Sequence, residues 1–341
     1  MKFTFSWLKE HLDTDRSLEE ITDMLSMIGL EVEAIEDKAK KLAPFVVGHV
    51  TATRQHPNAD RLKLCTVDMG TGIFEVVCGA PNARAGIKGV YAPEGSYIPG
   101  SDMTLKKSKI RGIESCGMLC SELELEMSDE HDGIIELPED AVIGAPVAEL
   151  LGASDAMIEI GLTPNRPDCA GVRGIARDLA AAGMGTLKPL DDAPVAGTYE
   201  SPIKWRIDLP EDAADACLMV VGRTFRGVTN GPSPKWLQDY LTAIGLRPIS
   251  ALVDITNYVT FGLARPLHVF DADKIAGDLV MRLANPGEKI LALDGETYEL
   301  TPDMVAIADD KGVQSIAGVM GGEATGCGGD TTSVFLEIAL F

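Results

Sequence analysis

Short β-like runs separated by turn residues fill residues 44–150, and this succession constrains the fold more than any other feature of the sequence. The runs follow one another at the spacing expected of a small barrel: VVGHVTATRQ, RLKLCTVDMG, FEVVCGAPN, GVYAPEG, DMTLKKSKIRG and GIIELP. Asn, Asp, Pro and Gly residues stand between several of these runs and are typical of tight turns. We therefore expect a small β-barrel in this part of the chain.

Helical patterns lie on both sides of the expected barrel. Ser17 and Glu20 form a capping box, apolar residues then recur at helical spacing, and residues 30–36 alternate like a strand. On the other side, Asp168 is expected to cap an amphipathic helix over residues 170–182. We expect this second helix to pack back on the N-terminal element, so that the two segments form one discontinuous α+β domain with the barrel inserted in it.

A linker and a further mixed domain follow. Residues 188–202 are rich in Pro, Asp and Ala and contain few side chains that can anchor a core, which indicates a domain boundary. Beyond it, Pro234 is expected to open a helix that runs through Ile244. Residues 291–298 have the pattern of a hairpin over an Asp-Gly turn. The last part of the chain therefore combines strands and helices.

Composition narrows the class of protein. The chain has 341 residues and 45% hydrophobic content, which is enough for two or three domains with cores. Its formal net charge of −22 disfavours contact with polyanions unless basic groups are concentrated locally. The amino-terminal MKFTFSWLKEHLDTD carries charge too early for a secretory signal, and no run of about eighteen apolar residues occurs. We expect a cytoplasmic protein that does not enter a membrane.

The cysteines favour reduced thiols over a disulfide framework, because there are 7 of them and they are scattered. A four-thiolate zinc site can be drawn from Cys65, Cys78, Cys116 and Cys120. Structural zinc sites have two tight pairs of ligands, whereas these residues offer one loose pair. We therefore expect no metal here and interpret the cysteines as small buried hydrophobic residues.

A local group of cations stands out against the acidic background. If DMTLKKSKIRG is one strand, Lys107, Lys109 and Arg111 project from the same face at a spacing of about 7 Å. Such a row fits a track of nucleic-acid phosphates. It equally fits a solvated edge strand whose lysines prevent aggregation. The residues alone leave both interpretations open.

The end of the sequence, SVFLEIALF, places a carboxylate in an apolar run. With the period of a β-strand, both faces of residues 333–341 are apolar, so Glu337 is expected to be buried. An unpaired buried carboxylate costs several kcal/mol, so Glu337 requires a donor in the fold or a ligand that donates to it. Because domains seldom end inside such a strand, we expect the natural chain to continue.

Other polar residues of the last domain can join Glu337 in a pocket. His268 is flanked by apolar residues, and Asn257 follows the strand-like LVDI, so both are expected to face an interior. The glycines of GVMGG, residues 318–322, do not fit a phosphate loop and instead mark a close approach of backbone to a ligand or strand. No serine or cysteine stands in a nucleophile elbow, so water is the expected attacker in any hydrolysis.

The sequence as a whole resembles the N-terminal part of the β subunit of bacterial phenylalanyl-tRNA synthetases. Ten collinear segments carry the resemblance: LKEHLD, MIGLEVEAIE, VVGHVTATRQHPNADRLKLCTVDMG, VCGAPN, KIRGIESCGMLCSE, DGIIELPEDA, TPNRPDC, VDITNYV, RPLHVFD and LDGE. The resemblance implies a multidomain α+β fold. In it, an OB-fold tRNA-binding barrel at residues 40–151 is inserted between the halves, 1–39 and 152–190, of a small domain. A B3/B4 editing domain then occupies residues 200–341 and is incomplete at its C-terminal end.

The family also implies roles for single residues. Its editing pocket is lined by an asparagine and a histidine that match Asn257 and His268, which we expect to orient the ester, the terminal ribose or the attacking water. The glycine of its wall matches Gly321, and the glutamate of its strand matches Glu337, beside Phe335 on the same strand face. Further pocket residues of the family lie past this strand and are absent here, so the pocket is expected to be incomplete.

The implied reaction is the removal of tyrosine wrongly attached to tRNA(Phe). Tyrosine differs from phenylalanine by one hydroxyl, which packing alone excludes from a synthetic site by only about a hundredfold. Glu337 is expected to accept a hydrogen bond from that hydroxyl, and phenylalanine would leave the carboxylate unpaired. The same resemblance implies an α subunit as partner in an α2β2 enzyme. That enzyme uses ATP and Mg²⁺, neither of which this part of the β subunit binds. The alternative is a stand-alone OB-fold nucleic-acid-binding or assembly module without catalysis.

Overall fold

The computed structural model describes residues 1–153 and 155–341. Two compact units emerge from its internal contacts: one combines Met1–Ala34 with Met157–Phe341, and the other is Ile35–Ala156. We describe each unit by itself. In the described residues, no helix has the length and apolar character needed to cross a membrane.

The Ile35–Ala156 unit is built on an antiparallel sheet with the strand order β12-β7-β4-β5-β6, in which β13 also pairs with β7. Its strands are β4 (Val46–Gln55), β5 (Lys63–Asp68), β6 (Ile73–Cys78), β7 (Lys88–Ala92), β12 (Met118–Leu119) and β13 (Glu136–Leu137). Two small ladders join β8 (Tyr97–Ile98) to β9 (Met103–Thr104) and β10 (Ser108–Ile110) to β11 (Ile113–Ser115). The expected succession of strands is present, but the strand pairings of the described residues do not close this sheet into a barrel.

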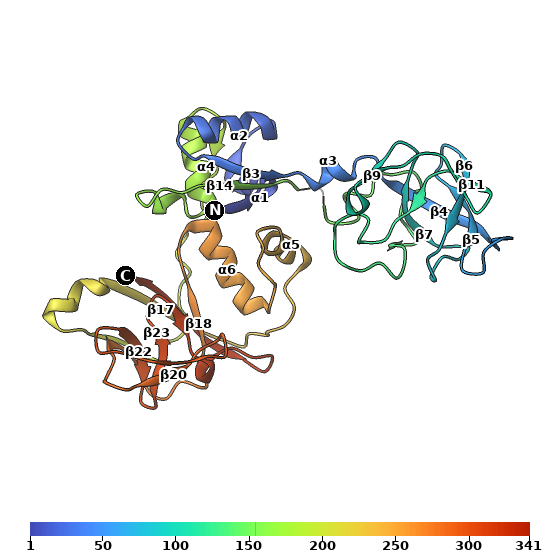
Figure 1. The fold of residues 1–341 in the computed structure, drawn as a ribbon. Helices are drawn as coiled ribbons and strands as arrows, with labels where there is room; N and C mark the ends of the chain where they lie inside the picture. Colours follow the sequence, from blue (N-terminus) through green and yellow to red (C-terminus); the bar gives the residue numbers. More distant parts are fainter. Residues whose placement is uncertain (154) are drawn as a thin grey trace. The chain divides into compact units, whose positions relative to one another are not determined.

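The first part of the other unit packs helices on a small sheet (Figure 1). The sheet has the order β1-β14-β3, from Lys2–Thr4, Met157–Ile160 and Val32–Glu36. Its helices are α1 (Phe5–His11), α2 (Leu18–Met27) and α4 (Val172–Ala181), and a short ladder joins β2 (Leu12–Asp13) to β15 (Thr186–Leu187). Residues far apart in the sequence share its core, including Phe3, Trp7, Ile158, Ile175 and Leu179. The predicted capping box is confirmed, because the Ser17 hydroxyl accepts from Glu20 N–H and the Glu20 carboxylate from Ser17 N–H.

Asp168 does not cap the following helix, so that prediction is wrong. Gly171 is the N-cap of α4, and Asp168 lies in the preceding 3₁₀ turn, Pro167–Cys169. The Asp168 carboxylate is held by the guanidinium groups of Arg166 and Arg177 instead. Two guanidinium groups, each with a full positive charge, hold this carboxylate and decide where it points.

The last part of the same unit contains two sheets that share one core. A five-stranded sheet has the order β16-β19-β22-β23-β24, from Trp205–Asp208, Leu279–Leu283, Val305–Asp309, Gly312–Ile316 and Met320–Gly321. A three-stranded sheet has the order β17-β25-β18, from Met219–Arg226, Ser333–Leu340 and His268–Asp271. Buried side chains of both sheets meet, among them Phe270, Met281, Ile307 and Phe335.

Two local predictions for this part are confirmed. Pro234 is the N-cap of α5 (Lys235–Ala243). A hairpin joins β20 (Lys289–Leu291) to β21 (Thr297–Glu299), and Gly295 in its turn has a φ of 84°, which favours glycine. Residues 188–204 contain no helix or strand, consistent with the predicted linker.

The strand expected at LVDI is instead part of helix α6 (Ala251–Leu263). The β-branched residues of this segment favour a strand locally. In the helix, the hydroxyl groups of Thr256 and Thr260 donate to the carbonyls of Val253 and Thr256, which satisfies these hydroxyls but does not by itself favour the helix. Tyr258 of the same helix stacks on Trp7 with ring centroids 5.2 Å apart. This tertiary contact, which no local pattern could indicate, favours the helix.

Candidate functional site

The central strand of the three-stranded sheet places Glu337 between two residues that share its face. In the antiparallel register, Glu337 of β25 lies opposite Gly222 of β17 and opposite His268 of β18. Side chains at directly paired positions project to the same side of a sheet, with Cβ atoms about 5 Å apart. The register therefore brings the carboxylate and the imidazole to one place.

Glu337 is buried and has no counter-charge. Its exposed fraction is 5%, and among the described residues no hydrogen bond or ion pair reaches its carboxylate. Burial without such a partner raises the pKa of Glu337 to about 7. The predicted burial of Glu337 is confirmed, and of the two partners that the sequence left open, a donor in the fold or a ligand, the described residues supply no donor in the fold.

His268 forms the neighbouring wall and is neutral at physiological pH. Its ring lies edge-on to Phe270, with centroids 4.3 Å apart and planes at 80°. Burial lowers the pKa of His268 to about 4. A base with such a low pKa accepts protons poorly near pH 7, so this imidazole is better suited to orienting a water or a carbonyl by hydrogen bonding than to removing a proton.

Gly321 leaves the space that the His268 ring occupies. A Cβ atom at Gly321 would lie 2.8 Å from Nε2 of His268 and closer still to its Cε1. Such an approach is shorter than real Cβ contacts, so any side chain at this position would displace the imidazole. The expectation that these glycines mark a close approach is correct here, and the partner is a side chain of the candidate site.

These residues line a cavity of about 390 Å³. Most of its wall is apolar, and its lining comprises Arg265, Pro266, Leu267, His268, Ile307, Ser315, Ile316, Gly318, Val319, Met320, Gly321, Glu337, Ala339, Leu340 and Phe341. The Ser315 hydroxyl is already engaged with the carbonyl of Met320 at 3.0 Å. The cavity can therefore hold an apolar group that ends in a hydrogen-bond donor to Glu337 and presents a polar bond to His268.

Two residues expected in the pocket do not line it. Asn257 lies half-buried in α6 and is absent from the cavity wall. Phe335, 2% exposed, faces the core, where it stacks on Trp205 at 6.1 Å and covers Gly222. Phe335 shares the strand face of Glu337, but its ring packs in the core with Trp205 and does not line the cavity. The spacing of residues in the sequence shows which face of the strand a side chain lies on. It does not show where along that face a cavity opens.

Lys107, Lys109 and Arg111 do not lie together on one strand, as was expected from the sequence. β10 covers only Ser108–Ile110, so Lys107 lies outside it, and Arg111 has a φ of 50° in the turn that follows. Lys107 pairs with Glu114 at 2.6 Å, and Lys109 stands opposite Glu114 in the register. The same-face argument for the three residues is therefore wrong, and their contact with tRNA stays a prediction.

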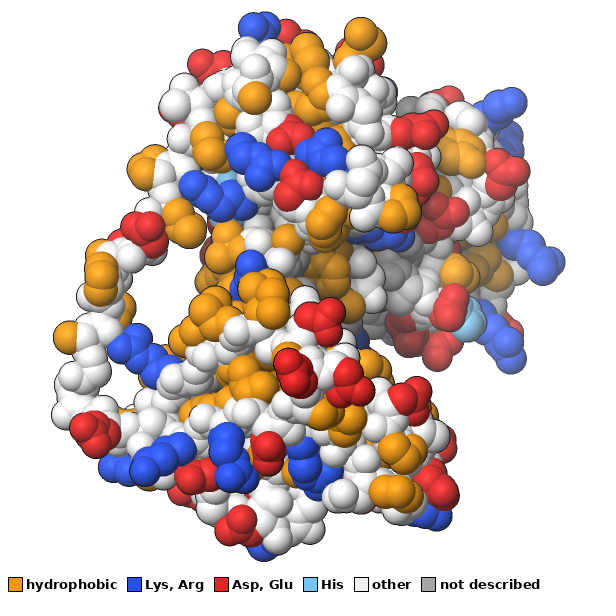
Figure 2. Space-filling view, turned by 90° about the vertical axis from the view of Figure 1, so that its left-hand side faces the viewer, with side chains coloured by type: hydrophobic (Ala, Val, Ile, Leu, Met, Phe, Trp, Pro, Cys, Tyr) orange, Lys and Arg blue, Asp and Glu red, His pale blue; other side chains and the backbone are white. Residues whose placement is uncertain are grey.

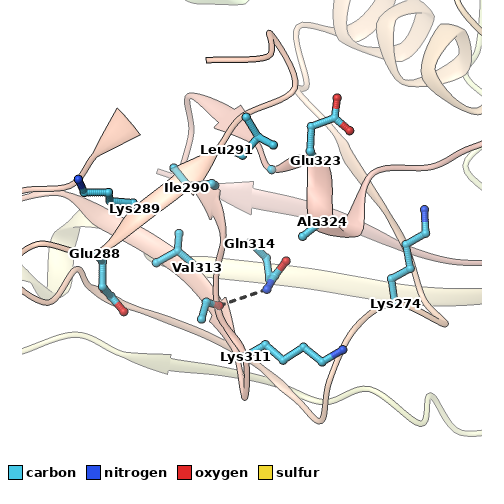
Figure 3. Close-up of a pocket in the computed structure, with 12 residues that line it drawn as sticks. Lys274, Glu288, Lys289, Ile290, Leu291, Lys311, Val313, Gln314, Glu323 and Ala324 are labelled. Atoms are coloured by element: carbon cyan, nitrogen blue, oxygen red, sulfur yellow. Dashed lines mark hydrogen bonds between the residues drawn. The ribbon is translucent and has the colours of Figure 1, made fainter. Parts of the chain in front are cut away.

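A larger hollow of about 640 Å³ lies elsewhere in the same unit (Figure 3). Its cations are mostly satisfied: Lys274 donates to the carbonyl of Gly326 at 2.7 Å, and Lys289 pairs with Glu299 at 3.2 Å. The Gln314 amide bonds to Gly312, as the dashed line in Figure 3 shows. Because this hollow contains no buried ionisable group without a partner, the smaller cavity is the better candidate site.

The described residues contain one group with metal-ligand spacing, formed by Asp168, Cys169 and Asp178. Arg166 and Arg177 donate to both carboxylates of this group, and the bonds hold the pKa of Asp168 well below its usual range. Two guanidinium groups already supply the positive charge that a cation would bring. We interpret the cluster as a structural ion-pair network.

Arg265 is a charged residue of the cavity wall that was not predicted from the sequence. It stands in RPLHVFD, three positions before His268. The available signal was its place in that segment, but its approach to the cavity depends on the turn after α6, where Ala264 has a φ of 54°.

The burial of Glu337 should be measurable as a stability difference. A carboxyl group whose pKa is raised on folding contributes its full stabilisation when the pH is below 4.5, its ordinary pKa. This stabilisation is lost as the pH rises through about 7, the pKa of Glu337 in the folded protein. A glutamine side chain at this position would be neutral throughout. Glu337→Gln should therefore stabilise β25 by about 1–3 kcal/mol at pH 8 and have no effect at pH 4.5. The stability difference is measured by hydrogen exchange of the β25 amides in the unaltered protein and in Glu337→Gln at the same pH. Glu323→Gln, which changes an exposed carboxylate, is the control. Equal protection at pH 8 would contradict it.

Comparison with known proteins gives two domain matches. Residues 45–146 match the family model "Putative tRNA binding domain", and residues 216–341 match "B3/4 domain". The candidate cavity lies within the second match. The α+β fold and these matches define the class of the chain, a protein that combines a tRNA-binding domain with a B3/4 domain.

Two curated relatives match the whole chain. It is 60% identical to the phenylalanine–tRNA ligase beta subunit of Mesorhizobium japonicum and 58% identical to that of Rhodopseudomonas palustris. Each match covers 100% of this chain, which spans 42% of the relative's length. A solved N-terminal fragment of the beta subunit from Pyrococcus horikoshii is 19% identical over 55% of this chain and 56% of its own, with a TM-score of 0.33. On the curated matches, the chain is similar over its whole length to phenylalanine–tRNA ligase beta subunits, of which it spans 42%.

Proposed function

We propose that the chain is the tRNA-binding and proofreading part of a phenylalanyl-tRNA synthetase β subunit. In this proposal, the cavity at Glu337 binds tyrosine that is wrongly attached to tRNA(Phe), and the ester bond between them is hydrolysed there. The observation that carries the proposal is the buried carboxylate of Glu337, 5% exposed and without a donor among the described residues, in a cavity that His268 also lines.

The chemistry needs few groups from the protein. The tyrosine ring occupies the apolar part of the cavity, and its hydroxyl donates to Glu337. Water attacks the ester carbonyl, the bond from that carbon to the ribose oxygen breaks, and the ribose oxygen takes up a proton as tyrosine leaves. His268, neutral at physiological pH, orients the water or the carbonyl. Asn257 lies in α6 and is not among the residues that line the cavity, so its proposed part in orienting the ester, the terminal ribose or the water has no support from the cavity geometry.

The remaining features of the whole enzyme are part of the same proposal. An OB-type domain at residues 40–151 binds tRNA, residues 1–39 and 152–190 form the domain around it, and residues 200–341 form the editing domain. An α subunit attaches phenylalanine with ATP and Mg²⁺ in a cytoplasmic α2β2 enzyme. The relatives' names support the assignment to a ligase β subunit, and the match of residues 45–146 to a tRNA-binding family supports the contact with tRNA.

A deacylation assay tests the proposal. Tyrosyl-tRNA(Phe) and phenylalanyl-tRNA(Phe) are incubated with this chain, with the full-length enzyme and with buffer, and the release of amino acid is followed. We expect the full-length enzyme to release tyrosine and to spare phenylalanine. Release of tyrosine at the buffer rate by the full-length enzyme would contradict the proposal.

The second candidate function is a nucleic-acid-binding or assembly module without catalysis. The match of residues 45–146 to a tRNA-binding domain favours it independently of the cavity. Such a module binds tRNA equally well whether the attached amino acid is tyrosine or phenylalanine, and it leaves both esters intact. The same assay therefore separates the two functions.

A further inference from the structure

One cation that lines the candidate cavity, Arg265, has no partner among the described residues. Arg265 is exposed and lines the cavity whose inner wall holds Glu337. Within the part of the chain that the structure describes, no ion pair or hydrogen bond reaches the Arg265 guanidinium. The cavity is therefore polarised, with a buried carboxylate inside and a free guanidinium at its mouth.

The backbone beside Arg265 is held in place from both directions. Ala264 ends α6 with a φ of 54° and packs against Gly171, where a Cβ atom would lie 2.8 Å from the carbonyl carbon of Leu263. Pro266 follows and restricts the chain further. Two residues later His268 begins β18. Because three residues span at most about 11 Å, Arg265 stays near the imidazole.

The negative net charge of the chain bears on how an unpaired arginine at the cavity is interpreted. The chain has a net charge of −22, and on the face in Figure 2 basic and acidic side chains are interspersed and do not form one basic surface. A polyanion is repelled by such a protein unless a cation meets it locally. A solvated surface arginine is the simplest alternative, but it does not explain why the unpaired cation lines the cavity that holds Glu337.

We propose that Arg265 binds the 5′-phosphate of the nucleotide whose ribose carries the aminoacyl ester. This inference rests on the proposed function. With the amino-acid ring at Glu337 and the ester at His268, the ribose points toward the mouth of the cavity, and its phosphate is the next anionic group along the ligand. The planar guanidinium offers paired donors that match two phosphate oxygens. Arg265 then sets the direction in which the substrate enters.

A matched pair of ligands tests the contact. The first is adenosine carrying tyrosine in a non-hydrolysable amide at the 3′ position, and the second is the same compound with a 5′-phosphate. Calorimetry measures both dissociation constants on the full-length enzyme. We expect the 5′-phosphate to strengthen binding about tenfold, as for one hydrogen-bonded charge pair, and Arg265→Gln to remove this gain. Lys311→Gln, which removes another exposed cation of the same unit (Figure 3), should preserve it.

Each outcome is decisive. Equal binding of the two ligands by the unaltered enzyme, or a phosphate gain that survives Arg265→Gln, overturns the role of Arg265 while the proposed function stands. If Arg265→Gln and Lys311→Gln reduce the affinity gain from the 5′-phosphate equally, the role of Arg265 is also overturned. Such a result would mean that the phosphate responds to the overall charge of the protein and not to one arginine. Failure of both ligands to bind the unaltered enzyme contradicts the proposed function itself, and the inference falls with it.

Discussion

Replacing Glu337 with alanine should abolish the preference of the proposed site for tyrosyl over phenylalanyl esters. Sites built to bond a hydroxyl reject the analogue that lacks it by about 10⁴- to 10⁵-fold, because the protein group is then buried and unpaired. Glu337 is 5% exposed and meets this condition. In Glu337→Ala, tyrosine release from tRNA should fall at least about a hundredfold, and the ratio of the two kcat/KM values should approach that of a purely apolar pocket.

The matched control is Glu323→Ala, which removes an exposed carboxylate from the other hollow of the same unit (Figure 3). It should leave tyrosine release unchanged. An unchanged rate in Glu337→Ala would show that the carboxylate does not read the hydroxyl. The selectivity of the unaltered enzyme should also rise with pH through about 7, because the ionised carboxylate is both the better acceptor and the costlier group to leave unpaired.

Gly321→Ala should reduce tyrosine release by about a hundredfold, although glycine contributes no functional group. The new Cβ would lie 2.8 Å from Nε2 of His268, so the imidazole must move away. A displacement of about 1 Å in a positioning group costs on the order of 10²-fold in rate. The loss should appear mainly in kcat, because the carboxylate that binds the tyrosine hydroxyl is not displaced directly.

Gly231→Ala serves as the control for this change. A Cβ atom there meets nothing within 4 Å, so the substitution tests only the general effect of alanine in place of glycine. The nuclear magnetic resonance signal of the His268 ring should shift in Gly321→Ala and stay in place in Gly231→Ala. Full activity in Gly321→Ala together with a shifted ring signal would refute the positioning role of His268.

Features with a local cause could be predicted from the sequence. The capping box at Ser17 and the Asp-Gly hairpin before Tyr298 depend on residues a few positions apart, and the structure confirms both. The burial of Glu337 also follows from local alternation, because both faces of its strand are apolar, whereas the absence of a partner for its carboxylate depends on the neighbouring strands.

Features that depend on distant contacts could not be predicted in this way. The helix at residues 251–263 is favoured by packing on Trp7, and the position of Phe335 depends on where Trp205 fills the core. The pairing of Lys107 with Glu114 requires a hairpin whose turn lies outside the strand pattern. Arg265 approaches the cavity only because the chain turns at Ala264. In each case, the residue that determines the structure is not part of the short sequence pattern on which the prediction was based.

The most direct test of the account follows the Glu337 carboxyl by carbon-13 nuclear magnetic resonance as the pH is varied. In the free protein, we expect a pKa near 7. The amide analogue of tyrosyl-adenosine should lower that pKa, because a phenol that donates a hydrogen bond stabilises the ionised form, whereas the phenylalanyl analogue should not lower it. An ordinary pKa in the free protein, or the same response to both analogues, would contradict the claim that Glu337 recognises the hydroxyl.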